Sequence, residues 1–303
     1  MDFITYLSFD GTCEEAFKHY ETVFRGKIEA MVRASDMPPG VQLDPGSENR
    51  IMHARLEVKG RLLMGGDAPP GRGHKPQGFC AHVKVEDPGE AERIFRELGA
   101  GGKVTMPLGD TFWARRFGML TDRFDVPWMV NCEKPMGQPE TRGRPFTISR
   151  SFDVPKDRLW RCFASAEGMR SWWGPKGVTI VSPSMEFRPG GMFHYGMKTP
   201  DGKIMWGRAH YREIVEGERI VYINAFSDET KGLTRHPLAP GWPIEMHTEF
   251  EFSEAAPGKS TFKVTWMPLY ATPDEQAAFD AGHDSMQQGW TGTLDRLSAS
   301  LKA

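Results

Sequence analysis

The side chains best placed to do chemistry lie on strand-like segments in the second half of the chain. Trp206 and His210 share one face of such a segment, and His247 lies on another. Pointing inward, they would give an apolar cavity a few polar anchors, as in many small-molecule sites; pointing outward, they would simply face solvent. Alternation favours the outward orientation for His247, because Met246 demands the opposite face. For Trp206 and His210 both orientations stay open.

Motifs for phosphate binding or nucleophilic catalysis are incomplete. Residues 65–74, GGDAPPGRGH, are glycine-rich like a phosphate loop, but they lack the Gly-Lys-Ser/Thr ending and no helical pattern follows. No serine occupies a Gly-x-Ser-x-Gly elbow. The four cysteines form no Cys-x-x-Cys pair, which predicts reduced, buried thiols at Cys13, Cys80, Cys132 and Cys162. No catalytic residue can be assigned on these grounds.

The composition indicates a folded chain that can bury a core. Of the 303 residues 39% are hydrophobic, and 38 basic residues against 40 acidic ones give a net charge of −2. This length predicts about two domains, and the even charge gives no reason to expect nucleic acid or an anionic membrane as a partner. No apolar run approaches the ~20 residues of a membrane span, and the N-terminus lacks a signal-peptide pattern. We therefore predict a cytoplasmic protein.

The segment 136–144 is the best linker candidate, because it combines proline and glycine with almost nothing apolar. We expect domains at residues 1–135 and 145–303. The first shows two rounds of strand, helix and three strands. A capping box of Thr12 and Glu15 should start its first helix, and Asp87-Pro88 its second. The pattern predicts an α+β fold of paired βαβββ modules.

The second domain shows a strand, a helix and then a series of antiparallel strands. A capping box of Thr272 and Glu275 precedes a long helix whose apolar stripe includes Trp290. A curved sheet around this terminal helix is the expected arrangement. Such a sheet encloses a cavity where the helix does not fill its concave face. The expected strands are 146–152, 191–197, 204–215, 219–226, 244–252 and 260–267.

Aromatic residues are dense in the segment 110–131. Trp113, Phe117 and Trp128 could stack on a flat or cationic guest in a groove, with His53 on a neighbouring strand. The alternative is that they pack in the core, as strand aromatics often do.

Residues 1–135 resemble the PhnB-like branch of the vicinal oxygen chelate (glyoxalase/bleomycin-resistance) superfamily. The segments that carry the resemblance are Phe9–Cys13, Met52–Leu56, Leu63–Asp67, Thr111–Ala114 and Val126–Asn131. One departure is Asp125, where the family often has glycine; aspartate also tolerates a left-handed turn. The resemblance implies the vicinal oxygen chelate fold and, frequently, a dimer.

In the metal-using members of that superfamily, the ligands come from the first and last strands of each module. At these places the chain offers Asp67 and His82 as ordinary ligands, with His53 as a third if it points inward. Asn131 stands where those relatives carry a stronger ligand. We therefore predict no cofactor, and Asp67 and His82 as the ligands if a divalent metal binds.

Residues 145–303 resemble SRPBCC (START-like) domains of the Hsp90 ATPase activator homologue type. The resemblance rests on the C-terminal helix and on Arg150–Pro155, Trp172–Pro175, Phe187–Gly191 and Trp206-Gly207. It implies a helix-grip fold and defines the activity hardly at all.

Together these patterns favour a two-domain protein that binds small apolar or aromatic molecules, with no assigned reaction. The alternatives are a metal-dependent glyoxalase, dioxygenase or resistance-type enzyme in the first domain, and a co-chaperone-like interaction module. The residues expected in the cavity of the second domain are Trp206, His210, Phe262, Trp266 and Trp290.

Overall fold

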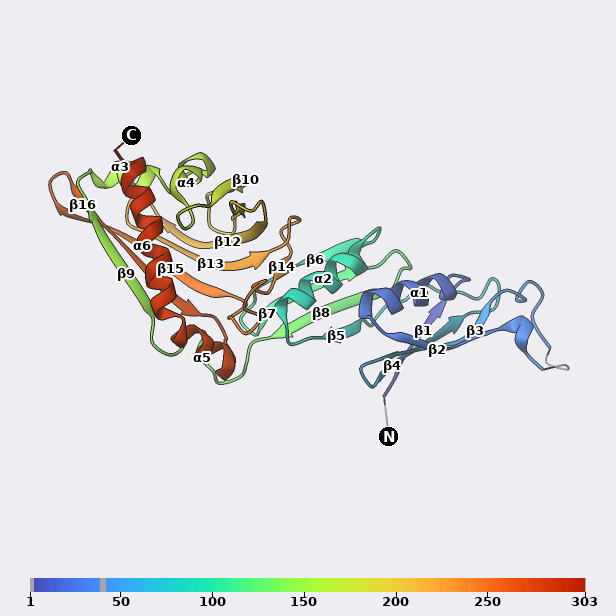
Figure 1. Cartoon of the computed structure of the whole chain (residues 1–303). Coiled ribbons are helices and arrows are strands. Elements are labelled where there is room, and N and C mark those ends of the chain that lie inside the picture. The colour runs from blue at the N-terminus through green and yellow to red at the C-terminus, as the bar shows by residue number, and fades with distance from the viewer. Residues whose placement is uncertain (1–2, 39–41, 303) are drawn as a thin grey trace. The chain divides into compact units, whose positions relative to one another are not determined.

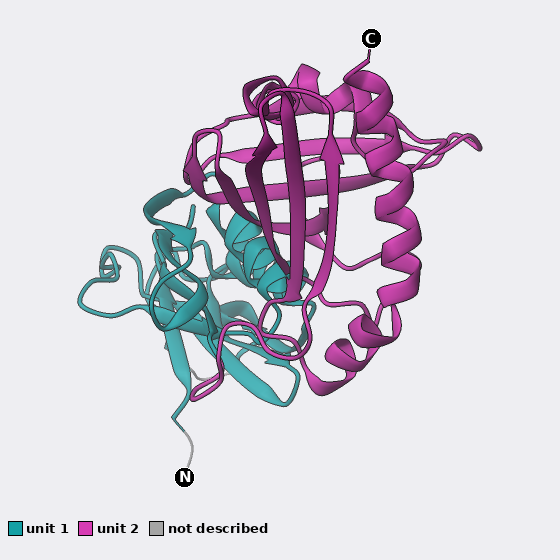
Figure 2. Ribbon diagram, turned by 90° about the vertical axis from the view of Figure 1, so that its left-hand side faces the viewer, with its two compact units in different colours: residues 1–134 teal, residues 135–303 magenta. Residues whose placement is uncertain are grey.

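The computed structural model describes residues 3–38 and 42–302. They divide into two compact units, residues 1–134 and 135–303 (Figure 2). Each unit has its own buried core. Within the described residues, no helix has the length and apolar character needed to cross a membrane.

The N-terminal unit contains two βαβββ modules, as predicted (Figure 1). The first consists of β1 (Thr5–Phe9), α1 (Cys13–Phe24), β2 (Lys27–Arg33), β3 (Ile51–Val58) and β4 (Arg61–Asp67), with a short 3-10 helix at Ala34–Asp36. The second consists of β5 (Ala81–Lys84), α2 (Pro88–Gly99), β6 (Lys103–Gly109), β7 (Ala114–Thr121) and β8 (Pro127–Glu133). Their sheets have the orders β1-β4-β3-β2 and β5-β8-β7-β6, with the first strand parallel to the last in each.

The two helices of this unit begin in different ways. Asp87 caps α2 as predicted, because its carboxylate accepts hydrogen bonds from the amides of Gly89 and Glu90. The capping box predicted for α1 is wrong, since the Thr12 side chain makes no capping hydrogen bond. Instead, Asp67 at the end of β4 accepts from the Gly11 and Cys13 amides, 2.9 and 3.0 Å from its Oδ1.

The core of the N-terminal unit is organised around the buried carboxylate of Asp122. Its Oδ2 accepts hydrogen bonds from the Tyr20 hydroxyl at 2.6 Å and the Trp128 indole nitrogen at 2.8 Å. Its Oδ1 accepts from the Phe124 and Val126 amides. Asp125, in the same turn, adopts a positive φ of 64°, which aspartate tolerates.

The C-terminal unit is one large antiparallel sheet with helices against it (Figure 1). Its strand order is β10-β11-β12-β13-β15-β16-β9, and β14 pairs with β13. The strands are β9 (Phe146–Phe152), β10 (Thr179–Met185), β11 (Met192–Lys198), β12 (Ile204–Val215), β13 (Arg219–Ser227), β14 (Leu233–Thr234), β15 (Met246–Ala256) and β16 (Lys259–Pro268). The helices are α3 (Lys156–Arg161), α4 (Ala166–Trp172), α5 (Pro273–Ala281) and α6 (His283–Ser300).

Besides the short strand β14 and the separation of α3 from α4, two features of this unit differ from expectation. β10 was not predicted; it is an edge strand that contains Pro183, with a register shift between Val181 and Ser184, which is where sheets tolerate proline. The C-terminal helix is also interrupted. The Thr272 capping box forms, but it starts α5, and Gly282 separates α5 from α6.

The predicted linker attaches to the C-terminal unit over part of its length. Thr141 forms a bridge with Leu269, and the Glu140 carbonyl accepts a hydrogen bond from the Tyr270 amide at 2.8 Å. The Arg142 guanidinium donates to the Ala271 carbonyl.

Candidate functional site

The C-terminal unit contains a cavity of about 430 Å³ between α6 and the concave face of the sheet. Strands β11, β12, β13, β15 and β16 contribute to its wall, together with α6 and the segments before β10 and after β14. None of the lining residues is Asp, Glu, Lys or Arg. They are Trp173, Gly174, Pro175, Tyr195, Met197, Gly207, Asn224, Ala225, Phe226, His236, Ala239, Trp242, Met246, Trp266, Gly282, Ser285, Met286, Gly289, Trp290 and Thr293.

Aromatic rings form much of this wall. The Trp290 ring of α6 packs nearly perpendicular to Trp266 and Trp173, with ring centroids 5.4 and 5.8 Å apart. Trp173 in turn meets the edge of Tyr195 at 5.8 Å. These ring contacts make a largely apolar wall.

The Tyr195 ring reaches the cavity because its cross-strand neighbour is a glycine. Gly207 pairs with Tyr195, and a Cβ on Gly207 would lie 2.8 Å from the Tyr195 hydroxyl. The glycine of the Trp206-Gly207 motif is therefore explained by the space that the Tyr195 side chain needs. Burial raises the pKa of Tyr195 to about 12, so its hydroxyl is protonated at neutral pH.

Two polar side chains in the wall are oriented by neighbours. The Asn224 Oδ1 accepts a hydrogen bond from the Thr248 hydroxyl, which lies 2.5 Å away. The His236 Nδ1 accepts from the Leu238 amide at 3.0 Å, and the His236 ring packs on Phe226 with centroids 4.3 Å apart. Burial lowers the pKa of His236, which favours the neutral ring.

The residues predicted for this cavity separate into two groups. Trp266 and Trp290 line it, and their role in binding stays a prediction. Phe262 does not, because it is fully buried in the core. Trp206 and His210 lie on the face of β12 opposite to Gly207, so they are not in the wall. Trp206 instead stacks on His194, with the ring planes 2° apart.

The sequence did not identify several residues of the cavity, chiefly Tyr195, Asn224 and His236. Alternation along β13 could have placed Asn224 on the face of Tyr222 and Phe226. His236 lies in an irregular segment, and no periodicity in the sequence indicates where it packs.

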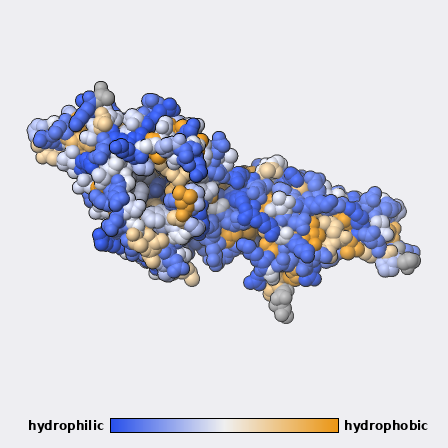
Figure 3. All heavy atoms as spheres, viewed as in Figure 1, coloured by the Kyte–Doolittle hydropathy of each residue, from blue (hydrophilic) through white to orange (hydrophobic). Residues whose placement is uncertain are grey.

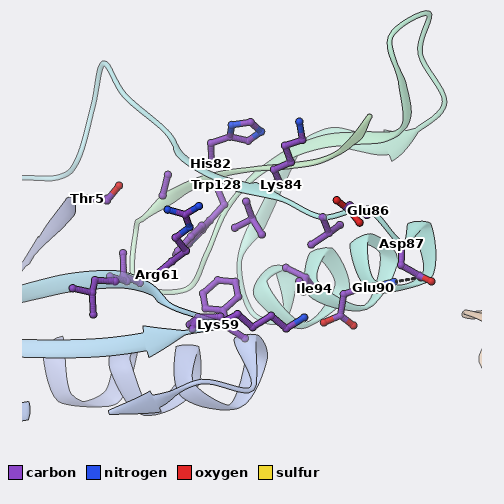
Figure 4. A pocket seen from close by; sticks show the side chains of 17 residues that line it. Thr5, Lys59, Arg61, His82, Lys84, Glu86, Asp87, Glu90, Ile94 and Trp128 are labelled. Carbon is purple, nitrogen blue, oxygen red and sulfur yellow. Dashed lines mark hydrogen bonds between the residues drawn. The ribbon is translucent and has the colours of Figure 1, made fainter. Parts of the chain in front are cut away.

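The N-terminal unit has an open cavity of about 570 Å³ between the ends of its two modules. Figure 4 shows Trp128 and Ile94 on one side of β5, while His82 and Lys84 point to the other side. On the face drawn in Figure 3, hydrophobic residues gather on this unit among hydrophilic ones. Charged residues, including Lys59 and Arg61, lie among the lining residues.

The aromatic groove predicted for the N-terminal unit is not assembled as one surface. Trp113 and Phe117 contact each other, with ring centroids 5.3 Å apart. Trp128 pairs with Leu120, three residues from Phe117, so it lies on the opposite face of the sheet, in the core. His53 belongs to the other sheet, where it stacks on Tyr6.

The two predicted metal ligands have different surroundings. Asp67 has both carboxylate oxygens engaged by backbone amides, since its Oδ2 also accepts from Ile51 at 2.8 Å. His82 lies on β5, in the other sheet of the unit. In residues 3–38 and 42–302, no group of three or more His, Cys, Asp or Glu side chains is arranged to hold a metal.

Comparison with known proteins assigns each unit to a family model. Residues 1–131 match the model described as 3-demethylubiquinone-9 3-methyltransferase. Residues 153–302 match the model described as Activator of Hsp90 ATPase homolog 1-like protein.

Individual similar proteins each cover about half of this chain. Protein YjdN of Escherichia coli K12 is 33% identical over 139 residues, which cover 43% of this chain and 93% of YjdN. Protein PA1353 of Pseudomonas aeruginosa is 44% identical, and the match covers 44% of this chain and 98% of that structure, with a TM-score of 0.41. An AHSA1 protein from Silicibacter pomeroyi is 17% identical, covering 52% of this chain and 98% of that one, with a TM-score of 0.41.

Proposed function

We propose that this chain, whose N-terminal unit belongs to the PhnB-like 3-demethylubiquinone-9 3-methyltransferase family and whose C-terminal unit belongs to the Activator of Hsp90 ATPase homolog 1-like family, is a small-molecule-binding protein. Its principal binding site is the cavity between α6 and the sheet of the C-terminal unit. The ligand is a small apolar or aromatic molecule.

The observation that carries this proposal is the size and lining of that cavity. A volume of about 430 Å³ falls within the range of small-molecule sites. The wall combines several aromatic and methionine side chains with a few polar ones and no Asp, Glu, Lys or Arg, which suits an uncharged guest.

Packing energetics support the same conclusion. Protein interiors are close-packed, and empty apolar space lowers the free energy of unfolding because the lining atoms lose contacts. The rest of this unit packs tightly, with residues such as Phe163, Phe250 and Phe262 buried against one another. The cavity beside this core opens to solvent and leaves apolar surface in contact with water, which a bound guest would bury.

Gly289 of α6 offers a way to test the proposal by filling the cavity. It lines the cavity, and a Cβ added there would meet no atom within 4 Å. We expect Gly289→Leu to occupy ligand space while adding helix propensity of about 1 kcal/mol. Titration of the full chain with N-phenylnaphthylamine, an uncharged fluorescent probe, should give micromolar affinity that Gly289→Leu weakens at least about tenfold.

The matched control is Gly292→Ala, which changes helix propensity one turn further along α6, outside the cavity wall. It should bind the probe like the unmodified chain. Probe binding that Gly289→Leu leaves unchanged, or no binding of the probe by the unmodified chain, would contradict the proposed site.

A further inference from the structure

Two polar residues of the cavity wall, Asn224 and His236, use their acceptor atoms within the protein and keep donors for other partners. Because the Asn224 Oδ1 already accepts from the Thr248 hydroxyl, the amide turns its Nδ2 protons to other partners. Thr248 is fully buried on the neighbouring strand β15, so its hydroxyl holds the Asn224 amide in this orientation.

His236 presents a donor for a similar reason. Its Nδ1 accepts from the Leu238 amide, so in the neutral ring the proton lies on Nε2. His236 packs on Phe226, which follows Asn224 by two residues on the same face of β13. The two donors therefore lie at the same end of the cavity.

The surrounding wall has hydroxyl groups at Tyr195, Ser285 and Thr293, which can accept or donate, but no charged acceptor. In the described part of the chain, the buried indole nitrogens of Trp266 and Trp290 have no hydrogen-bond acceptor. The carbonyls of Trp173, Gly174 and Pro175, beside the cavity, all accept from the Arg296 guanidinium. No carboxylate lines the cavity. A guest that supplies an acceptor would satisfy the Asn224 and His236 donors, whereas the buried indole nitrogens are not accessible from the cavity.

We infer that the ligand of this cavity is an uncharged aromatic molecule that carries a carbonyl-type oxygen, and that this oxygen accepts hydrogen bonds from Asn224 Nδ2 and His236 Nε2. The inference rests on the proposed function and specifies the chemistry of its ligand. The aromatic part of the molecule lies against Trp266 and Trp290, and the oxygen lies at the end of the cavity near Phe226. No anion is selected, because no Lys or Arg side chain lines the cavity.

Three probes of nearly the same shape test this inference by calorimetric titration of the full chain. Acetylnaphthalene carries the carbonyl oxygen. In isopropylnaphthalene a methyl group takes the place of that oxygen, and naphthylethylammonium carries only hydrogen-bond donors. Two net hydrogen bonds should make acetylnaphthalene bind about tenfold more tightly than isopropylnaphthalene. The ammonium probe should bind more weakly than either.

Two variants locate the effect. Asn224→Asp keeps an acceptor for Thr248 and replaces the donor with an acceptor. Both probes must desolvate the new carboxylate, so acetylnaphthalene should be weakened about tenfold more than isopropylnaphthalene. His236→Phe keeps the ring packing and should weaken acetylnaphthalene about fivefold. His247→Phe, on the opposite face of β15 from Met246, is the matched control and should change neither affinity.

The outcomes separate this inference from the proposed function. Equal affinities for acetylnaphthalene and isopropylnaphthalene, or tighter binding of the ammonium probe, would overturn the inference and leave the cavity as an apolar binding site. A carbonyl preference that persists in both variants would also overturn it, because other groups would then recognise the oxygen. Failure of all three probes to bind the unmodified chain would overturn the proposed function itself.

Discussion

Asp122 shows how much a single buried residue determines in the N-terminal unit. Its carboxylate accepts four hydrogen bonds, and two of the donors are the side chains of Tyr20 and Trp128. In Asp122→Asn, an amide NH2 group replaces one carboxylate oxygen, and this group cannot accept hydrogen bonds from the donors around it. We expect the free energy of unfolding to fall by about 2 to 4 kcal/mol, measured by urea denaturation.

The control for this change lies three residues away in the same turn. Asp125 is exposed and pairs with the exposed Lys75. Asp125→Asn keeps a residue that tolerates positive φ, so its effect should stay within about 0.5 kcal/mol. Equal effects of the two substitutions would show that the Asp122 network does not hold this turn.

Cys13 gives the N-terminal unit a specific dependence on pH. Burial, and to a smaller extent the charge of Asp67, raise the pKa of its thiol from 9.0 to about 12. Above about pH 9 the unfolded chain loses this proton while the folded chain keeps it, so the stability contribution present at lower pH is lost as the pH rises toward 12. Between about pH 8 and about pH 10, the free energy of unfolding, measured by urea denaturation, should fall by roughly 1 kcal/mol more in the unmodified chain than in Cys13→Ala. Parallel losses in both proteins would contradict this assignment.

At the scale of elements, Asp67 connects β4 to the start of α1 and to the start of β3. Its carboxylate accepts from the amides of Gly11, Cys13 and Ile51, and the helix dipole favours a negative charge at this position. Asp67→Ala should therefore lower the free energy of unfolding by about 2 to 3 kcal/mol. A chelator should leave the free energy of unfolding unchanged in both the unmodified chain and the variant.

Glu15→Ala is the control, because the capping box predicted for Glu15 does not form; its effect should be within about 0.5 kcal/mol. If a chelator instead destabilised the unmodified chain and had no effect on Asp67→Ala, Asp67 would be a metal ligand and this structural role would be wrong.

The caps also show which features of elements can be predicted from sequence. Asp87 caps α2 from a position next to the helix, so a short motif was sufficient. The acceptor at the start of α1 comes from Asp67, far along the chain, and depends on the parallel pairing of β1 with β4. The glycine at the break between α5 and α6 reflects a tertiary contact that the sequence does not reveal, because a Cβ on Gly282 would lie 2.9 Å from the Trp242 ring.

At the scale of the whole molecule, both folds were predictable because each rests on local patterns. The repeated order of strand and helix, and motifs such as Val126–Asn131 and Trp172–Pro175, are visible in the sequence. The composition of the cavity was only partly predictable. The place of Trp290 in the cavity wall can be predicted from the apolar stripe of α6. Asn224 and His236 reach the wall through the register of β13 and the path of an irregular segment, which the sequence does not show.

The central claim is that the cavity of the C-terminal unit binds a small aromatic molecule, and methionine-methyl NMR of the full chain tests it most directly. Of the methionines, Met197, Met246 and Met286 line the cavity, whereas Met169 belongs to the same core outside it and Met129 to the N-terminal unit. Addition of acetylnaphthalene should shift the methyl signals of the three cavity methionines and leave those of Met169 and Met129 in place. Shifts confined to methionines of the N-terminal unit, or no shift at a saturating probe concentration, would contradict the account.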